Sequence, residues 1–125
     1  MKLTDLRPLL WTPDVEASID FYTGVLGFTC DAHDDALGWA SLSRDSVTIM
    51  LSRPNAHFDF NGPIFTGSFY IHTTDATILW QELKDKVKVC YPLEDFAWGM
   101  REFAIYDNNG YLLQFGQELS EEREP

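Results

Sequence analysis

The sequence predicts an α+β fold made of two βαβββ repeats, at about residues 5–53 and 68–117. Two observations carry this prediction. An apolar strand candidate followed by a polar helix start occurs twice, with Asp14 and Asp75 at equivalent places. Each predicted helix is then followed by three strand candidates. A repeat of this length indicates two half-sheets that need each other to bury their apolar faces.

The first repeat opens with a strand candidate at residues 6–11 and a helix that begins at Thr12-Pro13-Asp14. Thr or Asp caps a helix, and proline suits its first turn. Gly27 is a natural stop. The apolar residues between these signals fall at helical spacing: Val15, Ile19, Tyr22 and Leu26. Three strand candidates, separated by polar turns, follow at residues 28–33, 39–43 and 46–52.

Residues 54–67 connect the two repeats and are rich in proline, glycine and asparagine. Aromatic residues, including Phe58 and Phe60, are interspersed among them. Because aromatic side chains dock on folded structure, we expect this connection to be ordered and to line a ligand cleft or a subunit contact.

The second repeat ends in a hairpin with a turn at Asp107-Asn108-Asn109-Gly110, because Asn and Gly tolerate positive φ. Trp98 and Gly99 lie at the entrance to this hairpin. A large flat ring beside a residue without a side chain offers a stacking surface to a ligand. The alternative is a tryptophan buried in the core, which composition alone favours. The elements expected in this repeat are strand 68–73, a helix after Asp75, and strands 87–91, 100–107 and 111–115.

The length of 125 residues and the mass of 14.3 kDa indicate a single domain over residues 1–125. No apolar run approaches the ~20 residues that span a bilayer, and the N-terminus lacks the apolar region of a secretory signal. We therefore expect a cytoplasmic protein with no membrane partner. Cys30 and Cys90 form no motif and are expected to be buried, reduced thiols.

The formal net charge is −11 and the pI is about 4.4. This balance argues against nucleic acid and anionic membranes as partners, since both require a basic surface. It favours the approach of a cationic ligand. The alternative is that the acidic charge only keeps the protein in solution.

Short motifs in both repeats resemble the vicinal oxygen chelate superfamily, which includes glyoxalase I, extradiol dioxygenases, fosfomycin resistance enzymes and bleomycin resistance proteins. The likeness covers residues 5–117 and implies a curved mixed-sheet cleft. The motifs of the second repeat are most similar to those of the bleomycin-binding branch. They depart from that branch in one respect, the additional residue Met100 between Gly99 and Arg101. The motifs are Asp14-Val15, Phe21-Tyr22, Leu26-Gly27-Phe28, Trp98-Gly99, Arg101-Glu102-Phe103-Ala104 and Asp107-Asn108-Asn109-Gly110.

Metal-dependent members of the superfamily present four ligand positions, which fall here at Arg7, Met50, Ser68 and Gln114. Arginine cannot coordinate a metal, methionine is a soft ligand, and serine and glutamine are weak neutral donors. The resemblance therefore implies no metal and no other cofactor. It argues against glyoxalase, dioxygenase and metal-dependent thiol transferase activity.

His72 shares a strand face with Ser68 and Tyr70, because side chains alternate along a strand. If Ser68 faces the cleft that the resemblance implies, His72 faces it too, and Trp11 holds a matching place in the first repeat. The alternative is a half-buried histidine satisfied by the backbone. The sequence shows no nucleophile motif, phosphate loop or Cys/His metal spacing, so it predicts no catalytic residue.

The likeness to bleomycin-binding proteins implies a homodimer that exchanges an N-terminal strand, here Leu3-Thr4-Asp5-Leu6, and grips a flat ligand between aromatic rings. Trp98 holds the position of the stacking tryptophan, and Trp39 lies close to that of its partner. The predicted function is metal-free sequestration of a planar, cationic small molecule such as a bleomycin-type antibiotic. The predicted ligand-binding residues are Trp98, Trp39, Gly99, His72, Trp11, Phe58, Phe60 and Glu102.

Two alternatives belong to other classes. The first is a lyase- or dioxygenase-like enzyme of the same fold that uses His72, Glu102 or Arg7. The second is a vestigial pocket in a purely structural dimer. The net charge and the missing metal ligands favour sequestration over the enzyme, and the vestigial pocket stays open.

Overall fold

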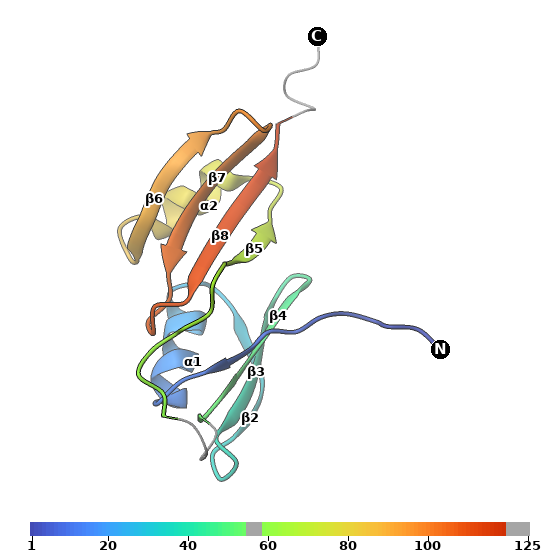
Figure 1. Cartoon of the computed structure of the whole chain (residues 1–125), viewed down its shortest axis with the longest axis vertical. Helices are drawn as coiled ribbons and strands as arrows, with labels where there is room; N and C mark the ends of the chain where they lie inside the picture. The colour runs from blue at the N-terminus through green and yellow to red at the C-terminus, as the bar shows by residue number, and fades with distance from the viewer. Residues whose placement is uncertain (55–58, 120–125) are drawn as a thin grey trace. The chain divides into compact units, whose positions relative to one another are not determined.

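The computed structural model describes residues 1–54 and 59–119, in two compact units, Met1–Pro63 and Ile64–Pro125. Each unit has the order strand, helix, three strands, and each contains one four-stranded sheet (Figure 1). The predicted α+β class and the two βαβββ repeats are therefore confirmed. The boundary between the units, at Pro63 and Ile64, falls inside the predicted connection 54–67.

The first unit is a mixed sheet with the strand order β1-β4-β3-β2. β1 runs parallel to β4, and the other neighbours are antiparallel. The helix α1 supplies the buried side chains of Val15 and Tyr22. The bounds are β1 Leu9–Trp11, α1 Val15–Gly24, β2 Thr29–Asp34, β3 Trp39–Arg44 and β4 Val47–Ser52.

The second unit repeats this plan with the strand order β5-β8-β7-β6. β5 is parallel to β8, whereas β8, β7 and β6 pair in antiparallel fashion. In Figure 1, β8 runs between β5 and β7, and β6 forms the opposite edge. The bounds are β5 Phe69–His72, α2 Ala76–Leu83, β6 Lys88–Asp95, β7 Met100–Tyr106 and β8 Leu112–Glu118.

Both helices begin at the predicted aspartates. The Asp14 carboxylate accepts a hydrogen bond from the backbone N–H of Ala17, and the Asp75 carboxylate accepts one from Ile78, each at 3.0 Å. These bonds satisfy backbone donors that the first turn of a helix leaves unpaired. The equivalent caps explain why the two starts were visible in the sequence.

The two faces of the second sheet have different roles. On one face, Trp80 of α2 packs on Phe103 of β7 at a centroid distance of 5.2 Å, and Phe103 stacks on Phe115 of β8 at 5.2 Å. Because side chains alternate, Glu102 and Gln114 point to the opposite face. The helix therefore covers the apolar face and leaves a polar face available for a site.

Three strands differ from the prediction by more than one residue, and one of them is β8, which continues past residue 115 to Glu118. β1 begins at Leu9 instead of residue 6, because Pro8 has no N–H to donate, although its carbonyl accepts from Met50 at 2.8 Å. β6 continues past Tyr91 to Asp95. Pro92 is tolerated because β6 is an edge strand and its pairing with β7 shifts register between Tyr91 and Glu94. In the part of the chain that the structure describes, no helix is long and apolar enough to span a membrane. The expectation that both cysteines are buried is wrong, because Cys90 is exposed and Cys30 is half-buried.

Candidate functional site

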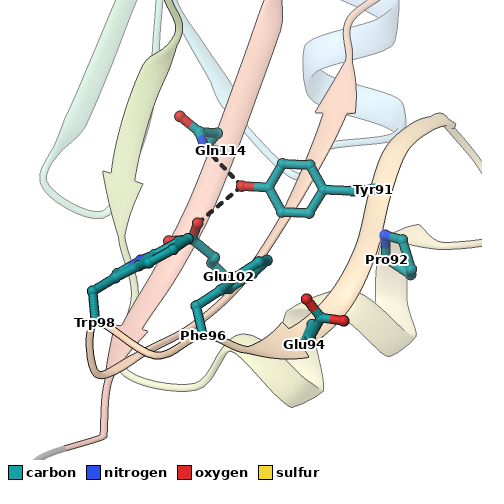
Figure 2. A pocket seen from close by; sticks show the side chains of 7 residues that line it. All are labelled: Tyr91, Pro92, Glu94, Phe96, Trp98, Glu102 and Gln114. Atoms are coloured by element: carbon teal, nitrogen blue, oxygen red, sulfur yellow. Dashed lines mark hydrogen bonds between the residues drawn. The ribbon is translucent and has the colours of Figure 1, made fainter.

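A pocket of about 350 Å³ lies in the second unit, beside the β6–β7 hairpin. Its lining includes a cluster of aromatic side chains, which we call the aromatic group, and a cluster of polar side chains, which we call the polar group (Figure 2). The polar group lies on the sheet face that α2 leaves uncovered. Its volume is within the usual range of small-molecule sites. The lining residues are Tyr91, Pro92, Glu94, Phe96, Trp98, Glu102 and Gln114.

The aromatic group is a stack of two rings. Trp98 lies on Phe96 with a centroid distance of 4.6 Å and an interplanar angle of 13°. Phe96 and Tyr91 form a T-shaped pair with a centroid distance of 5.7 Å and an interplanar angle of 85°. Trp98 is nonetheless 66% exposed. It is therefore not the core tryptophan of the alternative interpretation, because much of its surface remains open to solvent.

The turn that carries Trp98 is held by backbone bonds. The N–H of Phe96 donates to the carbonyl of Met100 at 2.8 Å, and the N–H of Gly99 donates to the carbonyl of Phe96 at 3.0 Å. Gly99 has φ of +87°, which other residues rarely adopt. Below the turn, Arg101 binds Asp95 through two hydrogen bonds of 2.7 and 3.2 Å. The hairpin that carries the Trp98 indole is therefore constrained in conformation.

The polar group centres on the Glu102 side chain, which is only 3% exposed. The Tyr91 hydroxyl donates to Glu102 Oε1 at 3.0 Å, and the Tyr70 hydroxyl donates to Oε2. Gln114 Nε2 donates to the Tyr91 oxygen at 2.7 Å, and the Ser68 hydroxyl donates to Gln114 Oε1. Figure 2 shows the Tyr91 hydroxyl between Gln114 and Glu102.

The surroundings of the two phenols keep them protonated. Burial raises the pKa of Tyr70 well above its ordinary value, and the hydrogen bond to the Glu102 carboxylate raises it further. Burial also raises the pKa of Tyr91; the Gln114 amide opposes this shift and Glu102 reinforces it. Both phenols are therefore donors at neutral pH, and the carboxylate is their acceptor.

The residues at the superfamily's metal positions do not suit a divalent metal ion. Ser68 and Gln114 are bonded to each other, and Gln114 also donates to Tyr91. Arg7 donates to Asp5 at 3.0 Å, and Met50 lies on β4. Hard cations prefer carboxylate oxygens, whereas these positions supply a guanidinium, a thioether and neutral donors. Among residues 1–54 and 59–119, no three His, Cys, Asp or Glu side chains are grouped to hold a metal.

The structure brings some of the predicted site residues together. Trp98 and Glu102 line the pocket, and Gly99 shapes the turn beside it. His72 lies against Tyr70 at a ring distance of 5.3 Å, and Tyr70 in turn binds Glu102. The expected common face of Ser68, Tyr70 and His72 is therefore present.

The remaining predicted residues belong to the first unit or lie outside the description. Trp11 contacts Phe60 edge-to-face at 6.4 Å, and Trp39 is the first residue of β3. Trp11, Phe60 and Trp39 belong to the first unit, whereas the residues that line the pocket belong to the second. Phe58 lies outside the described residues. Their roles in ligand binding stay predictions.

Sequence reasoning missed several pocket residues because it ended the sixth strand at Tyr91. The additional stretch of β6 supplies Pro92, Glu94 and the approach to Phe96. Phe96 and Trp98 are separated by a single residue, and this pair of nearby aromatic residues was the signal in the sequence for the aromatic group. Tyr91 was missed as a site residue because its partners, Glu102 and Gln114, are 11 and 23 residues away in the sequence.

Two βαβββ units, each with one mixed four-stranded sheet, are the fold of the glyoxalase-like class of proteins. The comparison of sequences is specific: the chain belongs to the Glyoxalase/Bleomycin resistance protein/Dioxygenase superfamily, whose family model matches residues 6–115.

Particular relatives lie within this superfamily. A bleomycin resistance protein from Geobacillus stearothermophilus is 32% identical over 133 residues, covering 90% of this chain and 95% of that protein. The bleomycin-binding protein of bleomycin-producing Streptomyces verticillus, solved with copper(II)-bleomycin, is 27% identical with a TM-score of 0.70, covering 92% of this chain and 96% of that one. TioX from Micromonospora sp. ML1 shares the fold at 20% identity with a TM-score of 0.77, covering 93% of this chain and 99% of that one.

Proposed function

We propose that this protein binds a planar, positively charged small molecule in the pocket of its second unit and sequesters it without converting it. A bleomycin-type antibiotic is the candidate ligand. The observation that carries the proposal is the exposed Trp98 ring, stacked on Phe96 and placed beside the buried Glu102 carboxylate.

The stacked rings support binding of a flat ligand. Trp98 is held on Phe96 within a constrained turn, so a ligand ring meets an indole that is already oriented. A favourable aromatic pair contributes about 1 kcal/mol beyond the area that it buries. The pocket therefore recognises ring shape with little ordering of its own side chains.

The charge of the pocket supports a cationic ligand. Glu94 and Glu102 both line it. The chain as a whole has a net charge of −11, which raises the local concentration of cations near its surface. A cation over an aromatic face gains a further attraction from the ring quadrupole.

The relatives support the identity of the ligand. The Geobacillus stearothermophilus relative is a bleomycin resistance protein, and the Streptomyces verticillus structure contains copper(II)-bleomycin. Both align over most of this chain. The same superfamily also includes enzymes, so the proposal needs a test that separates binding from catalysis.

The first test is a titration with copper(II)-bleomycin, followed by tryptophan fluorescence and calorimetry. We expect saturation at one ligand per chain. Trp98→Ala should weaken binding about five- to tenfold, because one stacked contact is lost. Ile78→Ala is the matched control, since Ile78 is also a large exposed side chain, at 56%, but lies on α2. Equal affinities for both variants would contradict the proposal.

The second test asks what happens to the ligand. After prolonged incubation with excess protein, the protein is denatured to release the bleomycin. The mass and the DNA-cleaving activity of the recovered bleomycin are then compared with those of untreated bleomycin. Sequestration predicts an unchanged mass and full recovery of cleavage. A product of different mass would favour the enzyme hypothesis, and a Glu102→Gln variant would then show whether the buried carboxylate takes part.

A further inference from the structure

The Tyr70 side chain reaches the pocket carboxylate from outside the pocket. Tyr70 lies on the edge strand β5, whereas Glu102 lies on β7, and β8 runs between them. The phenol nevertheless donates to Glu102 Oε2. Tyr70 is not one of the residues that line the pocket. Its hydrogen bond to Glu102 is the contact that links it to the pocket.

Gly116 provides the space for this reach. It pairs with His72 of β5 on one side and with Glu102 of β7 on the other. A Cβ atom at position 116 would lie 2.0 Å from the Tyr70 hydroxyl oxygen and 2.6 Å from its Cζ. These separations are far below van der Waals contact. The tyrosine ring crosses β8 only because position 116 has no side chain.

The Glu102 carboxylate is the final acceptor of the hydrogen bonds around it. Ser68 donates to Gln114, Gln114 donates to Tyr91, and Tyr91 donates to one oxygen of Glu102. Tyr70 donates to the other oxygen from the opposite side. With a donor at each oxygen, the carboxylate is fixed in orientation. A carboxylate oxygen can accept two hydrogen bonds, so each retains capacity for a ligand donor.

We propose that Tyr70 is a positioning residue that makes the pocket selective for positively charged ring systems, by holding Glu102 in the orientation that faces the ligand. This inference rests on the proposed function. It assigns the charge selectivity to a residue outside the pocket and to the glycine over which that residue passes. Loss of the hydroxyl, or a side chain at position 116, releases one side of the carboxylate and lowers the selectivity.

The test compares two flat dyes of matched shape. Thioflavin T carries a permanent positive charge, and its analogue without the ring N-methyl group is neutral. Quenching of tryptophan fluorescence gives the affinity of each dye for the wild type, Tyr70→Phe and Gly116→Ala. We expect the wild type to prefer the cation at least about tenfold, because the Glu102 carboxylate attracts its charge; neither dye has an N–H or O–H group to donate, so the charge is the difference that is tested. Both variants should lose most of this preference while retaining affinity for the neutral dye.

A double variant separates positioning from folding. Gly116→Ala should have no further effect on selectivity once Tyr70 is replaced by alanine, because no ring then crosses β8. Equal weakening of both dyes by Tyr70→Phe, or an unchanged preference, would overturn the role of Tyr70. So would a wild type that binds copper(II)-bleomycin but shows no preference between the dyes. A wild type that binds neither bleomycin nor dye would instead refute the proposed function itself.

Discussion

Glu94 on β6 lies directly opposite Glu102 on β7 in the antiparallel ladder. Like charges in such a pair destabilise a sheet, whereas a cation between them relieves the repulsion. The two side chains also line the same pocket, beside the Trp98 ring. If the proposed function holds, the repulsion between these two carboxylates is one source of affinity for a positively charged ligand.

Replacing Glu94 by glutamine should have opposite effects on stability and on binding. Without the repulsion, the free energy of unfolding should rise by about 0.5 kcal/mol, while the affinity for thioflavin T should fall. Urea unfolding and a dye titration measure the two quantities. Asp20→Asn is the control, because it removes the same charge from α1 in the other unit. Loss of both stability and affinity would contradict this account.

The raised pKa values of the two pocket tyrosines predict a loss of stability at alkaline pH. Unfolded tyrosine releases its proton near its ordinary pKa of 10.0, whereas folded Tyr70 and Tyr91 hold theirs to higher pH. Their contribution is therefore fully present below pH 10.0 and is lost as the pH rises toward the folded values. Urea unfolding between about pH 9 and pH 11 should show this decline.

The same tyrosines give a spectroscopic check. Tyr70→Phe should make the alkaline loss of stability shallower. Glu102→Gln should lower the pKa of Tyr70 toward 10.0, because the variant removes the carboxylate that reinforces the effect of burial. Ultraviolet titration of tyrosinate absorbance measures this shift. An unchanged titration curve in Glu102→Gln would contradict the bond between the two residues.

Gly99→Ala should destabilise the protein and weaken ligand binding together. Gly99 has φ of +87° and carries the hydrogen bonds that orient Trp98, so alanine is expected to cost about 1 kcal/mol or more. Gly24→Ala is the control, because Gly24 ends α1 with open space around it and no positive φ. That substitution should leave stability unchanged or raise it slightly. Calorimetric unfolding and copper(II)-bleomycin titration measure both effects.

We also propose that the chain forms a homodimer through its N-terminal segment. Leu3 and Leu6 are 95% and 92% exposed, which suits residues covered by a second chain. Deletion of residues 1–6 should convert a dimer to a monomer in sedimentation analysis. A Leu37→Ser variant, which alters an exposed apolar residue in the turn between β2 and β3, is the control. A wild-type monomer would refute this proposal.

The sequence predicted the order of elements well because local signals determine it. Asp14 and Asp75 cap the helices, and Asp107 accepts bonds from Asn109 and Tyr111 within the final turn, each at 2.9 Å. Strand ends were less accurate. A proline usually ends a strand, but at Pro92 an edge position and a register shift permit the strand to continue.

The site was predicted only in part, because its contacts are not local. Alternation placed Ser68, Tyr70 and His72 on one face, and the motif likeness indicated Trp98 and Glu102. The bond between Tyr70 and Glu102 joins residues 32 positions apart and crosses an intervening strand. It requires the strand order, and only that order shows that the Tyr70 ring passes over Gly116, where a Cβ atom would block it.

The crossing at Gly116 has an evolutionary consequence. The ring at position 70 and the vacant place at position 116 fit only as a pair, since a Cβ atom would overlap the phenol. Substitutions at the two positions are therefore expected to be correlated across related chains: lineages that acquire a side chain at 116 should have lost the tyrosine at 70. Substitution at a buried glycine that does not itself line the pocket would then change which molecules a descendant retains.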